Sequence, residues 1–185
     1  VLVGSANSEV DLCWARGDSG VTRFEDAFTK ELVVGATADG GATREQPSLL
    51  NALLATRFRI VSGYPGMNEI LLAMSRSEMD GVVGFSWSSS RVLIADQLKS
   101  GEFKLVMQLA LDKHKELPDT PLVMDLVKGD AEKALFKLIF ARQAMGRPVV
   151  APPGVDPRVL AVLRKAFDDT LADPDFIAET NKIGL

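Results

Sequence analysis

The sequence contains very little cysteine or histidine, with one residue of each, Cys13 and His114, among 185. A single cysteine excludes an internal disulfide framework and a multi-cysteine zinc site, and a single histidine argues against histidine-rich metal chemistry. Cys13 stands beside Trp14 in an apolar segment, where we expect a buried and inert strand residue. His114 lies in a lysine-rich polar turn and is expected at the surface. We therefore expect neither a metal nor a cofactor.

Long apolar runs and clusters of positive charge are also missing. No apolar run approaches the roughly 20 residues that a membrane span needs. The 21 basic and 25 acidic residues give a net charge of −4 without any run of lysine or arginine, so a nucleic-acid partner or an anionic membrane surface is not expected. The chain opens at Val1 without a signal peptide, and we expect either that a presequence was removed or that the chain begins inside a longer protein.

What remains is the composition of an ordinary globular chain. Hydrophobic residues make up 46% of the sequence and charged residues 25%, which is far from the polar, highly charged composition of disordered chains. At roughly 150 residues per domain, the length corresponds to about one domain, or to two small lobes that share a core.

Short apolar runs alternate with segments of helical periodicity in the first two thirds of the chain. The predicted strands are Leu32–Gly35, Phe58–Val61, Gly81–Gly84 and Lys104–Gln108. The predicted helices contain the stripes 49–54, 70–74 and 92–98, and the third helix ends at Gly101. This order predicts an α/β fold with a parallel-rich sheet and helices on both faces. The start of the first helix stays open between an N-cap at Thr43 and a start nearer Gln46, which would place Pro47 in the first turn.

The last third of the chain is less regular. A helix is predicted over 131–141, and the proline-bounded segment 146–154 is predicted to be an edge strand or a connection. Asp156 is expected to cap an amphipathic helix that has Pro157 at its first position. A final helix is expected to start at Asp173 and Pro174 and to end near Gly184.

The glycine-rich loop after the first predicted strand is the best candidate for a binding site. Gly35, Gly40 and Gly41 allow positive φ angles and a close approach of the backbone to a ligand, and the following helix start offers free N–H groups to a phosphate or carboxylate. The spacing is neither a dinucleotide fingerprint nor a P-loop. A plain strand-to-helix turn is the alternative. Asp39 opposes an anion unless its side chain points away, and Arg44 favours one if it points inward.

Two further segments, Gly63–Gly66 and Phe85–Ser90, each follow a predicted strand. Open α/β sheets bind ligands at this end of their strands. Tyr64, in the first of them, would either wall a pocket or pack in a proline turn. Ser86 and Trp87, in the second, would supply hydroxyl donors, an aromatic wall or a helix cap. Ser86 also resembles the serine of a nucleophile elbow without its final glycine, and His114 is the only available base. An α/β hydrolase-like enzyme with Ser86 as nucleophile is therefore the alternative to a binding protein.

Several segments together resemble the extracytoplasmic receptors of the tripartite tricarboxylate transporter family. The similar segments run in the family's order along most of the chain: Gly63–Gly66, Leu72–Gly81, Glu116–Leu122, Met145–Val155, Lys165–Thr170 and Asp173–Phe176. The resemblance implies a non-catalytic, periplasmic solute-binding protein with the type II periplasmic-binding-protein fold. It also implies a small organic carboxylate as ligand and a membrane permease as partner.

The resemblance further implies how the chain is divided between two lobes. Residues 21–142 would form a complete second lobe, and residues 1–20 and 143–185 would form part of the first lobe. The signal peptide and the glycine-rich loop with which family members begin have no counterpart here, so we expect an N-terminal part to be missing. Hinges for lobe closure are expected near Arg16–Asp18 and Met145–Arg147.

In the family, the ligand carboxylate is held between the lobes by backbone N–H groups, hydroxyls and ordered waters. Carried over by position, the ligand-binding residues of this sequence would be Gly35, Thr37, Gly40, Gly41, Thr43, Tyr64, Gly66, Ser86 and Trp87. Gly41 and Ala42 stand where serines are frequent in the family.

Overall fold

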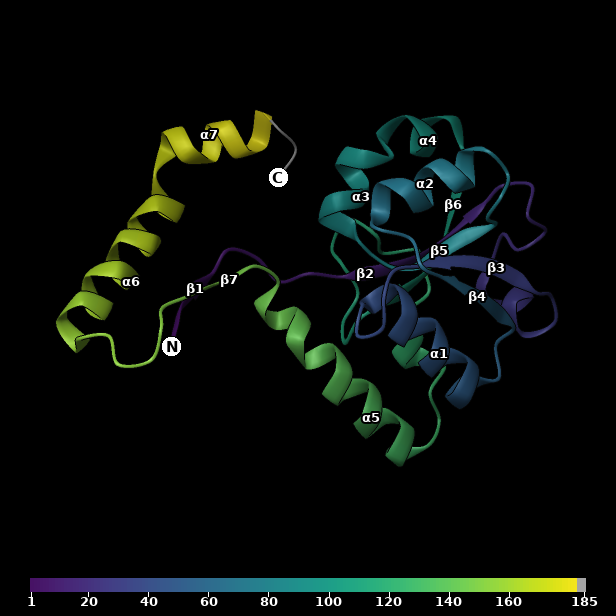
Figure 1. The fold of residues 1–185 in the computed structure, drawn as a ribbon, viewed down its shortest axis with the longest axis horizontal. Helices are drawn as coiled ribbons and strands as arrows, with labels where there is room; N and C mark the ends of the chain where they lie inside the picture. Colours follow the sequence, from purple (N-terminus) through teal and green to yellow (C-terminus); the bar gives the residue numbers. More distant parts are fainter. Residues whose placement is uncertain (183–185) are drawn as a thin grey trace. The chain divides into compact units, whose positions relative to one another are not determined.

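The computed structural model describes residues 1–182, and the chain divides into two compact units (Figure 1). The large unit is Val10–Phe140. The small unit combines Val1–Glu9 with the described residues from Ala141 onward.

The large unit contains five strands and five α-helices among the described residues. The strands are β2 (Asp11–Arg16), β3 (Leu32–Ala36), β4 (Phe58–Ser62), β5 (Gly81–Ser86) and β6 (Phe103–Leu109). The helices are α1 (Ala42–Leu54), α2 (Met67–Ser75), α3 (Trp87–Leu93), α4 (Ala95–Ser100) and α5 (Asp130–Phe140), with short 3-10 turns η1 (Phe24–Phe28) and η2 (Val123–Asp125). All four predicted strands are confirmed. The predicted helix over 92–98 is two helices, because Ile94 leaves helical geometry at φ −125° while its side chain is buried in the core.

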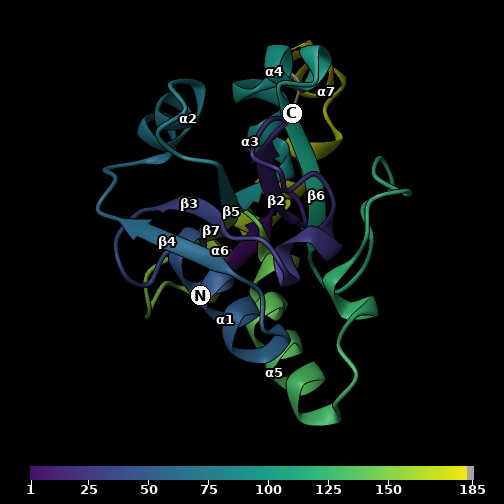
Figure 2. The ribbon, with the colours of Figure 1, turned by 90° about the vertical axis from the view of Figure 1, so that its right-hand side faces the viewer.

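The five strands form one sheet in the order β4-β3-β5-β2-β6 (Figure 2). β3 runs parallel to both β4 and β5, whereas β2 runs antiparallel to both β5 and β6. The parallel-rich sheet with helices on both faces is thus confirmed, with one antiparallel strand inserted. The large unit begins at Val10 rather than at the expected lobe boundary of residue 21, because β2 is hydrogen-bonded on both of its edges within this sheet.

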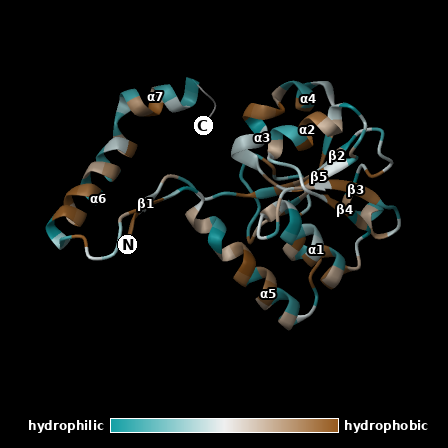
Figure 3. Ribbon diagram, in the orientation of Figure 1, coloured by the Kyte–Doolittle hydropathy of each residue, from teal (hydrophilic) through white to brown (hydrophobic). Residues whose placement is uncertain are grey.

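Helices cover both faces of the sheet. Figures 1 and 2 show α1 and α5 on one face and α2, α3 and α4 on the other. Leu50 of α1 packs with Phe136 and Phe140 of α5 in one buried cluster. Ile70 of α2 and Ile94 belong to a second cluster. Hydrophobic and hydrophilic residues alternate along α5 (Figure 3), as expected for a helix with one buried face.

The first helix begins earlier than either sequence interpretation predicted. Its N-cap is Gly41, and Pro47 lies inside the helix and is buried. Both expected starts were wrong because the Thr43 hydroxyl accepts the backbone N–H of Thr37 instead of capping its own helix. Thr43 therefore closes the glycine-rich loop from within the first turn of α1.

The small unit consists of a two-stranded ribbon and two helices. Its elements are β1 (Leu2–Ser5), η3 (Ala141–Met145), β7 (Pro148–Val150), α6 (Pro157–Ala172) and α7 (Pro174–Lys182). Among the described residues, β7 pairs only with β1, so of the two alternatives for the proline-bounded segment, an edge strand or a connection, the structure supports the edge strand. Asp156 caps α6 by accepting the N–H of Arg158, also as predicted. The predicted end of the last helix near Gly184 lies outside the described residues. Within residues 1–182, no helix is both long and apolar enough to cross a membrane.

Candidate functional site

The strand order of the large unit reverses between β3 and β5. The chain leaves β3 through α1 to reach β4 on one side, and then passes through α2 to β5 on the other side of β3. Because these three strands are parallel, their carboxyl ends share one edge of the sheet. Open α/β sheets bind ligands at this edge, at the point where the strand order reverses. The predicted site segments that follow β3, β4 and β5 all start from this edge.

The first turn of α1 offers two unpaired backbone donors at this edge. The N–H groups of Arg44 and Glu45 both donate to the carbonyl of Gly41, at 3.0 Å and 2.9 Å. Among the described residues, the N–H groups of Ala42 and Thr43 donate to no partner. The helix dipole adds a partial positive charge at the same place, which favours an anion.

A pair of threonine hydroxyls lies beside these donors. The hydroxyl oxygens of Thr37 and Thr43 are 3.0 Å apart, and the Thr43 oxygen also accepts the N–H of Thr37 at 3.1 Å. Only one of the two hydroxyls can donate within the pair. Whichever one does so, the hydroxyl hydrogen of the other stays available for an outside acceptor. The loop therefore presents a third donor next to the two amides.

The charged residues of the loop pair with each other. Arg44 Nε lies 2.5 Å from a carboxylate oxygen of Asp39, whose side chain is 88% exposed, and the Arg44 guanidinium also donates to the Ser62 hydroxyl at 2.6 Å. Asp39 is thus exposed, and Arg44 compensates its negative charge, which weakens the objection to an anion. Arg44 is engaged at the surface with Asp39 and Ser62.

The glycines of this loop differ in their roles. Gly40 has a φ of +85°, as predicted, but Gly41 has a φ of −85° and Gly35 lies within β3, so the expectation of positive φ is wrong for both. Gly35 is buried, and a Cβ there would lie 2.7 Å from Ile70 of α2. Gly35 is thus required for packing and does not lie with the loop residues. A Cβ at Gly41 would lie 2.8 Å from the Thr37 hydroxyl, so this glycine makes room for the threonine pair.

The loop after β4 is attached to the end of β3. The N–H of Tyr64 donates to the carbonyl of Ala36 at 3.2 Å, and Gly66 is the N-cap of α2. Tyr64 is half-buried and packs against the core cluster that includes Ile70. This contact supports the packing interpretation of its ring, while the loop itself lies at the carboxyl edge.

Gly84 is a further residue of the candidate site, and it is not among the residues predicted from the sequence. It has a φ of +84°, and a Cβ there would lie 2.6 Å from the carbonyl oxygen of Ala42. The first turn of α1 therefore rests directly on the backbone of β5. A glycine inside an apolar strand is the sequence signal for such a close approach.

Ser86 is the N-cap of α3 and Trp87 is its first residue. Hydrogen bonds and a ring contact hold both residues in place. The N–H of Trp87 donates to the carbonyl of Val10, and the hydroxyl of buried Ser90 donates to the carbonyl of Ser86, at 2.8 Å and 2.7 Å. The Trp14 indole donates to the Ser90 hydroxyl and stacks on the Trp87 ring at a centroid distance of 6.5 Å.

The structure gives no support to the hydrolase alternative. No hydrogen bond joins Ser86 to His114 among the described residues, and Nδ1 of His114 already accepts the N–H of Glu116. His114 is half-buried against the Trp87 ring, at a centroid distance of 6.3 Å, so the expectation of a simple surface residue is wrong. Cys13 is buried as predicted, and burial raises the pKa of its thiol to about 12, which leaves it unreactive. The described residues contain no group of three or more potential metal ligands.

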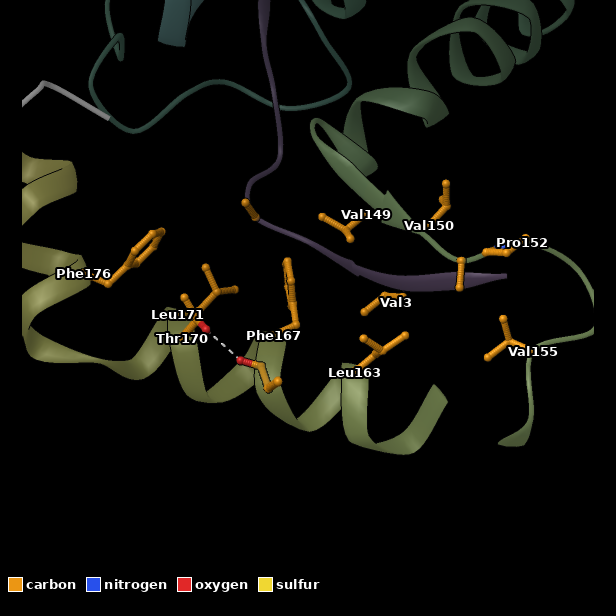
Figure 4. A pocket seen from close by; sticks show the side chains of 13 residues that line it. Val3, Val149, Val150, Pro152, Val155, Leu163, Phe167, Thr170, Leu171 and Phe176 are labelled. Atoms are coloured by element: carbon orange, nitrogen blue, oxygen red, sulfur yellow. Dashed lines mark hydrogen bonds between the residues drawn. The ribbon is translucent and has the colours of Figure 1, made fainter. Parts of the chain in front are cut away.

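The small unit contains a pocket of about 510 Å³ between its ribbon and its helices (Figure 4). Leu163 and Phe167 of α6 extend toward β1, and Thr170 is the only polar residue among the described residues of the lining. The Thr170 hydroxyl donates to the carbonyl of Ala166. Within residues 1–182, the lining includes none of the predicted ligand-binding residues and no charged side chain, so this pocket is not suited to a carboxylate.

Solved structures of periplasmic solute-binding proteins share this fold. The chain is similar to a TctC solute-binding protein from Polaromonas, with a TM-score of 0.60 and 11% identity over 96% of this chain. It is also similar to Rpa4515 of R. palustris, which was solved with adipate, with a TM-score of 0.66 and 14% identity over 99% of this chain. A third similar structure is the periplasmic binding protein BugD, with a TM-score of 0.56 and 18% identity over 97% of this chain. The predicted fold class is confirmed.

These similarities concern the fold. The chain spans 57% of the length of the TctC protein and 58% of the lengths of Rpa4515 and BugD. No protein-family model matches the sequence, and neither does any curated protein.

Proposed function

We propose that this chain belongs to a periplasmic receptor of the tripartite tricarboxylate transporter family, and that it binds a small organic carboxylate without catalysis. The observation that carries the proposal is the pair of unpaired amides, Ala42 and Thr43, at the strand reversal. Two N–H groups and a hydroxyl hydrogen match the two oxygens of a carboxylate, and the helix dipole balances its charge without a net positive surface. The net charge of −4 is therefore compatible with an anionic ligand.

The proposed site is built from three loops of the large unit. The loop after β3 supplies hydrogen-bond donors, the loop after β4 supplies backbone and an aromatic ring, and the segment after β5 supplies the start of α3. The residues of the proposed site are Thr37, Gly40, Gly41, Thr43, Tyr64, Gly66, Ser86 and Trp87. In this proposal the large unit corresponds to the second lobe and the small unit to part of the first. A membrane permease would receive the ligand, and the hinges would lie near Arg16–Asp18 and Met145–Arg147.

A titration followed by amide NMR tests the proposal at the atoms that carry it. Acetate, adipate and citrate represent mono-, di- and tricarboxylates, and adipate is chosen because Rpa4515 was solved with it. We expect saturable downfield shifts of the Ala42 and Thr43 amide protons with at least one acid, while the amide of Phe136 on α5 stays unchanged. If none of the three acids shifts these two amides, the proposal is wrong.

Replacing Thr43 by valine is expected to weaken carboxylate binding by up to about one order of magnitude, because it removes the hydroxyl that accepts the Thr37 N–H and closes the loop, and such a hydrogen bond contributes roughly 0.5–1.5 kcal/mol. Valine keeps the shape of threonine but removes one hydroxyl of the Thr37 pair. Thr56→Val is the matched control. Thr43 and Thr56 are 5% and 6% exposed, and the Thr56 hydroxyl donates to Asn51 within the region between α1 and β4. Calorimetric titration of both variants with the acid that binds best should show the loss of affinity for Thr43→Val alone.

A further inference from the structure

The loop that follows β6 is attached to the sheet through one buried side chain. Gln108 is fully buried, and its amide nitrogen donates to the carbonyls of Leu117 and Thr120 at 2.8 Å and 3.0 Å. Its amide oxygen accepts the N–H of His114 at 2.8 Å. These three hydrogen bonds connect the loop 110–121 to β6, although most of its side chains are exposed.

From this loop, Glu116 reaches two residues of α3. Its carboxylate accepts the Trp87 indole N–H at 2.7 Å and accepts the Arg91 guanidinium at 3.0 Å through each oxygen. Trp87 is the first residue of α3, and Arg91 lies one turn further on. A single carboxylate thus binds two points of one short helix, and both bonds are of the stronger, charge-assisted kind.

We propose that Glu116 is a positioning residue, which fixes the first turn of α3 and thereby the Ser86–Trp87 segment of the carboxylate site. The inference rests on the proposed function for its effect on ligand binding, but its geometric part does not depend on a ligand. Because the indole N–H is bound to Glu116, Trp87 offers the carbon surface of its ring, and not a donor, to its surroundings. Arg91 compensates the negative charge that Glu116 would otherwise add near an anionic ligand.

The ionisation of Glu116 agrees with this role. The hydrogen bond from Trp87 and then that from Arg91 lower the pKa of Glu116 below its ordinary value. The groups that face Glu116 are the Arg91 guanidinium and the Trp87 indole on α3 and the imidazole of His114 on its own loop. Since the pKa is lowered, the contact is complete above the ordinary pKa of a glutamate and is lost only as the pH falls through the lower, folded-state value.

The test compares Glu116→Gln with Glu31→Gln. Glu31 is an exposed glutamate that pairs with Arg59 at 2.9 Å, so its substitution causes the same change of charge away from α3. The sequence contains two tryptophans, so two indole N–H resonances are expected, and Trp87→Phe identifies the relevant one. In Glu116→Gln we expect this resonance to move upfield, hydrogen exchange of the Trp87 amide to accelerate, and adipate affinity to fall about three- to tenfold. Glu31→Gln should change none of these.

Each outcome decides one part of the proposal. An unchanged indole resonance in Glu116→Gln would overturn the contact, and an unchanged exchange rate of the Trp87 amide would overturn the positioning role. Adipate affinity equal to that of Glu31→Gln would overturn the link to the site. Failure of the wild-type chain to bind any of the three acids would contradict the proposed function, whereas the indole and exchange measurements would still decide the positioning role. In the wild type, acidification should move the indole resonance upfield, and Glu116→Gln should abolish this step; a step that persists in Glu116→Gln would contradict the assignment to Glu116.

Discussion

Replacing Gly84 by alanine is expected to lower the free energy of unfolding by about 2–5 kcal/mol, the sum of two separate costs. The first cost is conformational, because Gly84 has a φ of +84°, which penalises a residue with a Cβ by roughly 1–2 kcal/mol. The second is steric, because the Cβ would lie 2.6 Å from the carbonyl oxygen of Ala42 and 3.1 Å from the nitrogen of Thr43. Backbone atoms on both sides must then move, which costs about 1–3 kcal/mol.

Gly20→Ala separates the two costs. Gly20 has a φ of +81°, but a Cβ there would meet no atom within 4 Å, so this variant carries the conformational cost alone. Urea denaturation of both variants should show a larger loss for Gly84→Ala, by about 1–3 kcal/mol. Gly84→Ala should also weaken carboxylate binding, since the amides of Ala42 and Thr43 lie where the first turn of α1 would be displaced. Equal losses in the two variants would mean that α1 does not rest on β5 in this way.

The hydrophobic pattern was sufficient to predict most of the large unit. The runs at Leu32–Gly35, Phe58–Val61 and Gly81–Gly84 are strands because they are apolar, β-branched and bounded by glycine, and the alternation with helical stripes predicts their parallel order. The position of β2 was not predictable in this way. Its partners β5 and β6 follow it by more than 60 residues, so no local pattern specifies that it lies between them and runs antiparallel to both.

The candidate site was predictable in its location but not in its details. A glycine-rich loop after a parallel strand indicates the carboxyl edge, and the structure places Thr37, Gly41 and Thr43 there. The sequence left open whether Asp39 opposes an anion, because the answer depends on a side-chain contact with Arg44. The partnership of Glu116 with Trp87 was likewise inaccessible, since it joins residues 29 positions apart through a loop without regular structure.

A buried polar contact beneath the proposed site gives the other large expected effect. Gln46 lies on the second turn of α1 and is 1% exposed, and its amide nitrogen donates to the carboxylate of Asp11 at the start of β2. Asp11 is itself buried and is paired with Ser86 and Leu109 in the sheet. Among the described residues, the amide oxygen of Gln46 has no hydrogen-bond partner. The contact thus joins α1 to the start of β2 through the amide nitrogen alone.

Replacing Gln46 by glutamate is expected to destabilise the chain by about 3–5 kcal/mol at pH 7, because it sets a second carboxyl against the Asp11 carboxylate in a buried place. The two groups should share one proton, so the pKa of the introduced carboxyl is raised in the folded state above its unfolded value. The folded state then binds more protons than the unfolded state, and the free energy of unfolding falls as the pH rises, by up to about 1.4 kcal/mol per pH unit. The cost is therefore smallest near pH 4 and largest near pH 7.

The variant Gln46→Met provides the control, because it removes the hydrogen bond that the Gln46 amide donates to Asp11 without adding a titratable group. We expect a loss of about 1–3 kcal/mol that changes little between pH 5 and pH 8. Urea denaturation of the wild type and of both variants across this range measures the difference directly. If the free energy of unfolding of Gln46→Glu differed from that of the wild type by the same amount at every pH, the introduced carboxyl would not be taking up a proton. The side chains of Gln46 and Asp11 could then not face each other. If the loss of unfolding free energy in Gln46→Glu instead grows with pH, this buried pair joins α1 to β2, one helical turn after the amides of Ala42 and Thr43.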